Sequence, residues 1–108
     1  MIQLTVLYGK PQDSAAFDTY YQGTHTGLVQ KIPGLKGFVF TKPASLNSQE
    51  PSPYYLIANL YFESMAALQT ALQSPESQAA AGDLQNFATG GATLLVGEVQ
   101  AFTPVSIS

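Results

Sequence analysis

The chain has 108 residues, of which 45% are hydrophobic, and it carries a formal net charge of −3 at pH 7. It contains no cysteine and no arginine, and its four basic residues are all lysines within residues 1–42. This composition is typical of one globular domain and excludes disulfides, thiolate chemistry and cysteine-ligated metal centres. Four scattered lysines also make a poor nucleic-acid surface, because such binding requires several phosphates to be neutralised.

The hydropathy pattern predicts neither a membrane span nor a secretory signal. No apolar run reaches the ~18 residues that a membrane-spanning helix needs. Residues 1–8 lack the basic start and the small-residue cleavage site of a signal peptide. We therefore expect a cytoplasmic protein that does not bind a membrane.

The first predicted element is a half-buried strand at residues 2–8, where apolar and polar side chains alternate. A turn follows, and Asp13 or Ser14 can cap the next helix. One stripe of that helix comprises Phe17, Tyr21, Thr24, Leu28 and Ile32. Pro33 and Gly34 then end it, because neither residue favours helix continuation.

Two glycines interrupt this helix. Gly23 and Gly27 each cost about 1 kcal/mol in a helix interior relative to alanine. We therefore expect the helix to break near Gly23 and to restart with Thr24 as its cap. The same segment carries His25, which is the only histidine of the chain.

His25 is the candidate for proton transfer near neutral pH, because imidazole has an unperturbed pKa close to that pH. A helical step of 100° places it about 80° from Phe17, at the edge of the apolar stripe. From there it can point into a cleft and act as a general base, a general acid or a hydrogen-bond donor. The same position also fits a structural histidine that bonds to a backbone carbonyl.

Two further strands are predicted on either side of a long loop. The first comprises residues 35–42. Residues 54–62 are almost continuously apolar, which is typical of a central strand covered on both faces. Residues 43–53 are rich in proline and serine and are predicted to form a mobile loop.

Ser64 is predicted to cap a helix that turns Met65, Leu68 and Leu72 inward. The helix restarts at residues 74–76, which supply a serine cap, a proline at the first helical position and an acid in the first turn.

This restarted helix is predicted to run to about Phe87. A turn at residues 89–91 leads into a last strand at residues 94–102.

The resulting order of elements, β-α-β-β-α-β, is that of the ferredoxin-like fold, in one domain of residues 1–108. Right-handed crossovers place the two helical segments on one face of a four-stranded antiparallel sheet. The other face is then bare, and an uncovered apolar face on a soluble protein is usually an interface. We therefore predict a homodimer that packs two sheets face to face.

Two motifs resemble one known family, the EthD family of dimeric α+β barrel proteins. Residues 74–76 and 82–87 resemble its second-helix signature, and the opening strand that ends in Tyr8 agrees with the family pattern. Gly27 and Gln85 depart from that pattern, since proline is common at both positions. The first-helix motif consists of Tyr21, His25, Leu28, Lys31, Pro33, Gly34 and Leu35.

This resemblance implies a small enzyme, or an accessory protein of an oxygenase system, that acts on a hydrophobic organic molecule. Family members are often labelled oxidoreductases through their association with oxidative degradation of ether fuel additives. The wider superfamily includes cofactor-free monooxygenases, isomerases and polyketide cyclases. A cofactor-free isomerase or cyclase, a non-catalytic ligand-binding or interaction module, and a housekeeping dimer without a small ligand are therefore alternatives.

Three residues are candidates for catalysis: His25, Tyr21 and Asp83. Tyr21 lies one helical turn before His25, so the two side chains can meet. Asp83 can fix the tautomer of the imidazole across the fold, or it can accept backbone N–H bonds from the following turn. Candidate substrate-binding residues, each of which also fits a core or interface role, are Tyr8, Phe40, Asn59, Tyr61 and Phe87.

No metal and no cofactor are expected. One histidine, no cysteine and scattered acids do not supply metal ligands at the usual spacing. The glycines of residues 89–91 precede a predicted strand instead of following one, so neither a Rossmann nor a P-loop motif is indicated.

Overall fold

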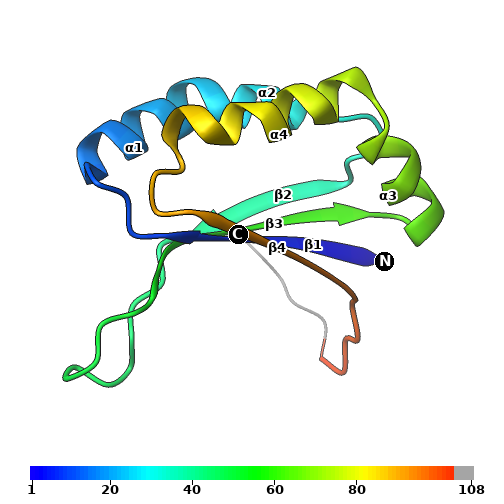
Figure 1. Ribbon diagram of the computed structural model, residues 1–108. Helices are drawn as coiled ribbons and strands as arrows, with labels where there is room; N and C mark the ends of the chain where they lie inside the picture. Colours follow the sequence, from blue (N-terminus) through cyan, green and yellow to red (C-terminus); the bar gives the residue numbers. More distant parts are fainter. Residues whose placement is uncertain (104–108) are drawn as a thin grey trace.

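In the computed structural model, which describes residues 1–103, four strands form one antiparallel sheet in the order β2-β3-β1-β4. The helices lie together along one face of this sheet (Figure 1). This is the predicted ferredoxin-like arrangement, although residues 104–108 of the expected domain lie outside the described residues. The strands are β1 (Ile2–Gly9), β2 (Gly37–Thr41), β3 (Tyr54–Phe62) and β4 (Ala92–Glu98). The helices are α1 (Ser14–Tyr20), η1 (Tyr21–His25), α2 (Thr26–Gln30), α3 (Met65–Leu72) and α4 (Pro75–Phe87).

The helix-facing side of the sheet forms the floor of the core. The alternation predicted for the first strand is present, and β1 pairs with β3 on one side and β4 on the other. An aromatic cluster of Phe17, Tyr21 and Phe87 packs against Tyr8 from the helices. The buried apolar side chains of β1 and β3 are Ile2, Val6, Tyr8, Leu56, Ala58, Leu60 and Phe62.

The opposite side of the sheet, which we call the outer face, has no helix over it (Figure 1). Its central part combines apolar side chains with three hydrogen-bonded polar ones, which are Gln3, Thr5 and Asn59. Among these, the Thr5 hydroxyl donates to Asn59 Oδ1 at 2.7 Å. The residues of β1 and β3 that alternate with the core set and so belong to the outer face are Gln3, Thr5, Leu7, Ile57, Asn59 and Tyr61.

The first helical segment does not break at Gly23 as expected. It continues through residues 21–25 as one wide π turn, and Thr24 is not a cap. The Thr26 N–H bonds to the Tyr21 carbonyl five residues back, while the Thr26 hydroxyl donates to the Gln22 carbonyl at 3.0 Å. The widened turn therefore keeps the chain helical where the glycine penalty predicted a break.

Side-chain caps begin α1, α3 and α4 where the sequence predicts them. Asp13 accepts the Ala16 N–H at the start of α1, and Ser64 accepts the Ala67 N–H at the start of α3. Ser74 accepts the Ser77 N–H before α4. These bonds satisfy backbone donors that have no partner within the first helical turn.

Helix α3 differs from its prediction in the side chains that it buries. Leu68 and Ala71 are buried, whereas Met65 and Leu72 are 41% and 47% exposed. The short helix lies at one end of the sheet, so only one narrow stripe reaches the core (Figure 1).

The last strand begins and ends earlier than predicted. Strand β4 pairs only with β1, and Tyr8 lies opposite Ala92 while Ile2 lies opposite Glu98. Glu98 thus lies opposite the first residue of β1, and beyond it the Val99 N–H bonds to the Met1 carbonyl at 2.9 Å. The second strand is also shorter than residues 35–42.

Candidate functional site

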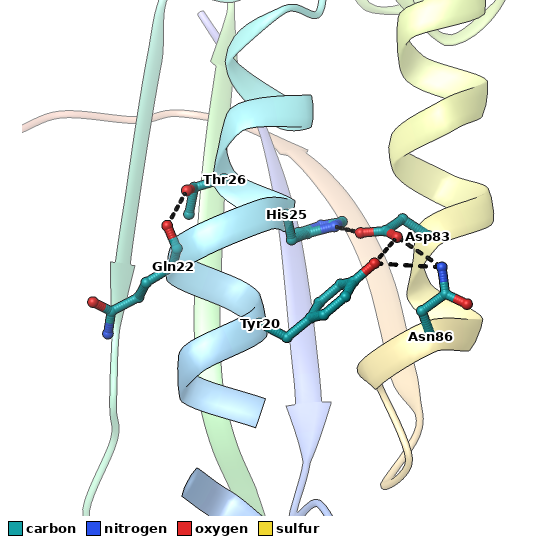
Figure 2. Close-up of polar contacts among 6 residues, drawn as sticks. All are labelled: Tyr20, Gln22, His25, Thr26, Asp83 and Asn86. Carbon is teal, nitrogen blue, oxygen red and sulfur yellow. Dashed lines mark hydrogen bonds and ion pairs between the residues drawn. The ribbon is translucent and has the colours of Figure 1, made fainter. Parts of the chain in front are cut away.

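The centre of the candidate site is a contact between two distant helical segments. His25 Nδ1 lies 3.0 Å from Asp83 Oδ2, and both side chains are buried. Figure 2 shows the imidazole from η1 facing the carboxylate from α4. The predicted pairing of these residues is therefore present, with the side chain of Asp83 turned to the imidazole and not to the following turn.

Asp83 receives two further hydrogen bonds on its other oxygen. The Tyr20 hydroxyl donates to Oδ1 at 2.5 Å, and Asn86 Nδ2 donates to the same atom at 2.9 Å (Figure 2). Three donors thus fix the carboxylate in one orientation. A carboxylate held in this way fixes the direction of the imidazole ring that it contacts.

The π turn explains why Tyr20 and His25 point to the same carboxylate. Positions five apart are about 140° apart around an ordinary α-helix at 100° per residue. In a π turn, the i and i+5 positions instead approach alignment, because that is the spacing of its hydrogen bonds. The local backbone therefore brings Tyr20 and His25 together at Asp83.

The electrostatics of the pair favour a neutral imidazole beside an ionised carboxylate. Burial lowers the pKa of His25 and outweighs the opposing effect of Asp83. Burial alone would raise the pKa of Asp83, but the bonds from Tyr20, Asn86 and His25 hold it below its usual value. We assign the imidazole proton to Nδ1, because an ionised carboxylate accepts it there. Nε2 then carries a lone pair.

An apolar cavity of about 80 Å³ lies between the helices and the sheet. His25, Tyr21 and Tyr8 contribute to its wall, and the rest is almost entirely aliphatic or aromatic. Leu72 and Leu94 also line it, yet they are 47% and 50% exposed. These two side chains therefore mark the mouth of the cavity, between α3 and the edge strand β4.

Some polar side-chain atoms on the cavity wall have no hydrogen-bond partner among residues 1–103. Neither the hydroxyl of Tyr8 nor that of Tyr21 forms a hydrogen bond, and His25 bonds through Nδ1 alone. No fully enclosed side-chain nitrogen or oxygen of the described residues lacks a partner. These atoms therefore keep some access to open space, which is the arrangement expected of groups that meet a ligand or water.

The structure brings some of the predicted site residues together. Tyr8, Tyr21 and His25 line the cavity, and the Tyr21 ring is 5.4 Å from the imidazole. Phe87 packs beside His25, with ring centroids 4.6 Å apart, without lining the cavity. Phe40 packs on Tyr21 and is 37% exposed.

Asn59 and Tyr61 are placed elsewhere. Their positions alternate with the buried side chains of β3, so they belong to the outer face. Asn59 accepts the Thr5 hydroxyl there, which gives its amide the partner that a partly buried polar group needs. Neither residue lines the cavity around His25.

Several residues of the site lie outside the predicted catalytic and substrate-binding sets. Tyr20 and Asn86 hold Asp83, while Phe38 and Ser77 line the cavity. Asn86 was recognisable as a neighbour of Asp83, because helical positions three apart share a face. Tyr20 was not, because its alignment with His25 depends on the π turn.

Residues 1–103 contain neither a side-chain cluster suited to a metal ion nor a helix suited to a membrane. No group of three or more histidine, cysteine, aspartate or glutamate side chains is arranged to hold a metal ion in this part of the chain. None of its helices is both long enough and apolar enough to span a membrane.

The fold and site define a ferredoxin-like α+β protein with a buried histidine–aspartate pair on an apolar cavity. The chain belongs to the EthD family, since residues 10–91 match the EthD domain. It is 46% identical over 104 residues to an uncharacterized 11.0 kDa protein in the thcB-thcC intergenic region of Rhodococcus erythropolis, covering 96% of this chain and 100% of the relative. An EthD family protein from Bacillus halodurans is 35% identical, with a TM-score of 0.86 over 93% of this chain and 99% of its own.

More distant solved structures share the fold alone. The cofactor-independent oxygenase SnoaB from Streptomyces nogalater is 12% identical, with a TM-score of 0.69 over 96% of this chain and 97% of its own. A hydroxynitrile lyase from Passiflora edulis is 16% identical, with a TM-score of 0.71 over 95% and 97%. A dimeric ferredoxin-like protein from Thermobifida fusca is 13% identical, with a TM-score of 0.68 over 91% and 90%.

Proposed function

We propose that this protein binds a small hydrophobic organic molecule in the apolar cavity and that His25 acts on it as a general base. Asp83 orients the imidazole and stabilises the imidazolium that forms when Nε2 takes a proton. Tyr21 and Tyr8 orient the ligand beside it. In this proposal the protein is a small enzyme of the EthD family.

The observation that carries the proposal is the contact between His25 Nδ1 and Asp83 Oδ2 at 3.0 Å. It leaves Nε2 as the lone-pair nitrogen of a residue that lines the cavity. A buried structural histidine would also need an acceptor for its N–H, but it would have no need to place its second nitrogen on an apolar cavity. The carboxylate, itself held by Tyr20 and Asn86, matches the arrangement in which an acid sets the tautomer of a working imidazole.

We further propose that this chemistry needs neither a metal nor a bound cofactor. Proton transfer by imidazole requires only a suitably placed acidic proton on the ligand. The fold is compatible with such chemistry, since SnoaB is a cofactor-independent oxygenase and another neighbour is a hydroxynitrile lyase. The oxidoreductase and the isomerase or cyclase alternatives share this first step and differ only in the later ones, after the proton has been removed.

The second candidate is a non-catalytic carrier or an accessory protein of an oxygenase system. The apolar lining of the cavity favours it, because such a lining can hold a hydrophobic molecule without taking part in chemistry. In that case the cavity would still bind a ligand, but its chemical conversion would not depend on His25.

A comparison of wild type with His25→Gln tests the proposal. Phenols, lactones and quinones would be screened for binding by NMR, and any that bind would be followed for conversion. We expect similar binding but at least a 100-fold loss of conversion in the variant, because positioned acid–base groups contribute about 10²–10⁴-fold. Equal conversion by both proteins would eliminate His25 as the base, whereas binding without conversion by either would favour the carrier function.

The outer face is proposed to pair two copies of the chain into a homodimer. No helix covers it, and Leu7, Ile57 and Tyr61 belong to it (Figure 1). A self-complementary sheet face is the simplest way to bury such a surface in a two-fold dimer. The dimeric ferredoxin-like neighbour supports this proposal.

A further inference from the structure

Tyr8 and Tyr21 are the two tyrosines that line the cavity, and both are almost completely buried. Their ring centroids lie 5.6 Å apart, and each hydroxyl is without a hydrogen-bond partner among residues 1–103. Buried tyrosine hydroxyls usually find such a partner. Both residues line the same cavity as His25. The cavity wall thus carries two hydroxyl donors and one lone-pair nitrogen.

Both hydroxyls stay protonated near neutral pH. Burial raises the pKa of Tyr21 and, more strongly, that of Tyr8, which is raised further by charge repulsion from Tyr21 and Asp83. Each side chain is therefore available as a donor. The matching ligand atom is an acceptor.

The charge of the wall limits which acceptor can enter. None of the four lysines lines the cavity, and Asp83 lies just behind it as an ionised carboxylate. A carboxylate or phosphate ligand would have no cation to pair with in an apolar space, and that is costly. The acceptor therefore belongs to a neutral molecule, at least until it reacts.

We propose that the hydroxyls of Tyr8 and Tyr21 form a donor pair for a carbonyl oxygen, so that the substrate is a neutral ketone or related carbonyl compound with a C–H bond next to the carbonyl. This inference rests on the proposed role of His25 as a base and names the chemical class on which it acts. Each of the three polar groups then has a defined partner on one ligand.

The corresponding step is a proton transfer without oxidation. His25 Nε2 takes the proton from the carbon next to the carbonyl, and the C–H electron pair becomes the C=C bond of an enolate. The carbonyl π pair moves to oxygen, where the developing negative charge is held by the two hydroxyls. Hydrogen-bond donors placed where charge develops stabilise the transition state more than the ground state, and they therefore lower the barrier. Return of the proton from His25 completes a reversible exchange.

The volume of the cavity limits the size of the part of the substrate that can enter it and react. At about 80 Å³ it is smaller than the ~150 Å³ cavity that admits benzene. The carbonyl and its neighbouring carbons fit inside, while a larger ring or chain extends through the mouth between Leu72 and Leu94. These two exposed leucines give the protruding part an apolar surface.

The test is hydrogen–deuterium exchange at the carbon next to the carbonyl, followed by ¹H NMR in D₂O. Cyclopentanone, cyclohexanone and 1-indanone serve as probes, and methylenecyclopentane serves as the matched molecule without oxygen. We expect wild type to accelerate exchange of at least one ketone over buffer. Tyr8→Phe and Tyr21→Phe should each lower that acceleration about 10-fold or more, and the double variant should lower it further.

Tyr54→Phe is the matched control, because Tyr54 is exposed and does not line the cavity. It should leave exchange unchanged. Thermal melting of each variant shows whether it is folded, and the single imidazole reports ligand binding independently through its NMR signals.

The outcomes separate this inference from the proposed function. Exchange that requires His25 but is unaffected in both Tyr→Phe variants overturns the donor pair and leaves His25 as the base. Ketones that shift the His25 signals without exchanging overturn the carbonyl assignment alone, and so does equally tight binding of methylenecyclopentane. Exchange that persists in His25→Gln overturns the proposed function, and failure of every ketone to bind or exchange overturns the carbonyl assignment.

Discussion

His25 and Asp83 are 58 positions apart in the chain, yet the imidazole Nδ1 of one lies 3.0 Å from the carboxylate Oδ2 of the other. The contact joins the π turn of the first helical segment to α4 across the top of the core (Figure 2). It gives each partner a function that it lacks alone. The carboxylate sets the imidazole tautomer, and the imidazole is one of the three donors that keep the carboxylate ionised.

Asp83→Asn should abolish most proton-transfer activity while preserving the fold. The amide keeps the shape of the carboxylate, but it neither fixes the Nδ1–H tautomer nor stabilises an imidazolium. We expect a loss of about 10²- to 10⁴-fold in activity and a lower pKa for His25. Kinetics and NMR titration of the imidazole measure these effects. Asp13→Asn is the control, because asparagine caps helices as well as aspartate does, and a loss of similar size there would discredit the assignment.

Tyr20→Phe should raise the pKa of His25. The Tyr20 hydroxyl donates to Asp83 Oδ1 at 2.5 Å and competes with His25 for the electron density of the carboxylate. Without it, Asp83 becomes a stronger acceptor and stabilises the imidazolium better, and the pKa of Asp83 also rises. NMR titration of the single histidine measures the change. An unaltered His25 pKa in this variant would show that Tyr20 does not act through Asp83.

The stability of the protein should fall as the pH is lowered below 6.5. The folded-state pKa of His25 is lowered from 6.5, so in that window the unfolded chain binds the proton more readily than the folded one. The contribution of His25 to the free energy of unfolding is fully present above pH 6.5, and it declines as the pH falls toward the folded-state pKa. The groups that face the imidazole are Asp83 from α4, Tyr21 from η1 and Tyr8 from β1, and both tyrosines remain neutral throughout.

Urea unfolding at pH 7.5, 6.5 and 5.5 tests this expectation with His25→Gln as the comparison. The variant should lose less stability than wild type between pH 6.5 and 5.5. Asp83 contributes a separate loss at lower pH, because the stabilisation from its lowered pKa is fully present above 3.8 and is lost as the pH falls from there toward the folded pKa. An identical pH dependence in both proteins would mean that the folded pKa of His25 is not lowered.

Ala80→Val should reduce ligand affinity by about 10-fold or more. Ala80 is buried and lines the cavity, and two additional methyl groups occupy much of its small volume. Ala79→Val is the matched control on the exposed side of the same helix, with an equal change in helix propensity. Titrations followed through the His25 signals compare the two variants. If both bind as wild type does, the ligand lies elsewhere.

Ile57→Asp should convert a dimer into a monomer. Ile57 belongs to the outer face, and a carboxylate placed there would be buried without a partner if two sheets pack together. Sedimentation of wild type should give twice the mass of one chain, and the variant should give one chain mass. Met65→Asp, on an exposed side chain of α3, serves as the control. A monomeric wild type would refute the proposed interface.

Much of the fold follows from sequence patterns that act locally. The alternation in residues 2–8 and the serine caps before α3 and α4 depend on nearest neighbours, and both are present in the structure. The strand ends do not depend on such patterns. Strand β4 ends at Glu98, opposite Ile2 at the start of β1, and only the pairing register shows this.

The part of the candidate site that was predictable from the sequence is the residue whose type occurs once in the chain. His25 is the only imidazole, and its position at the edge of the apolar stripe places it next to the core. The contact of Tyr20 with Asp83 was not predictable. In an α-helix with 3.6 residues per turn, Tyr20 and His25 would point in different directions, and only the π turn aligns them. A glycine penalty indicates strain at residues 23–27 without distinguishing a break from a wider turn.

Strand β3 shows a second limit. Both of its faces are apolar, so alternation separates Asn59 and Tyr61 from Leu60 without indicating which set the helices cover. Similarly, Phe38 and Phe40 share one side of β2, but only Phe38 lines the cavity. Which of two equivalent positions lines the cavity depends on how the helices cross the sheet, and that is a property of the whole fold.

The central claim is that His25 is a neutral imidazole whose Nδ1 proton is held by Asp83 and whose Nε2 is open to a ligand. The most direct measurement is ¹⁵N NMR of the single histidine during a pH titration, with and without a ligand found by screening. We predict a protonated Nδ1, a pKa below 6.5, and a change at Nε2 when the ligand binds. A proton on Nε2, or a pKa at 6.5 that no ligand alters, would contradict the claim.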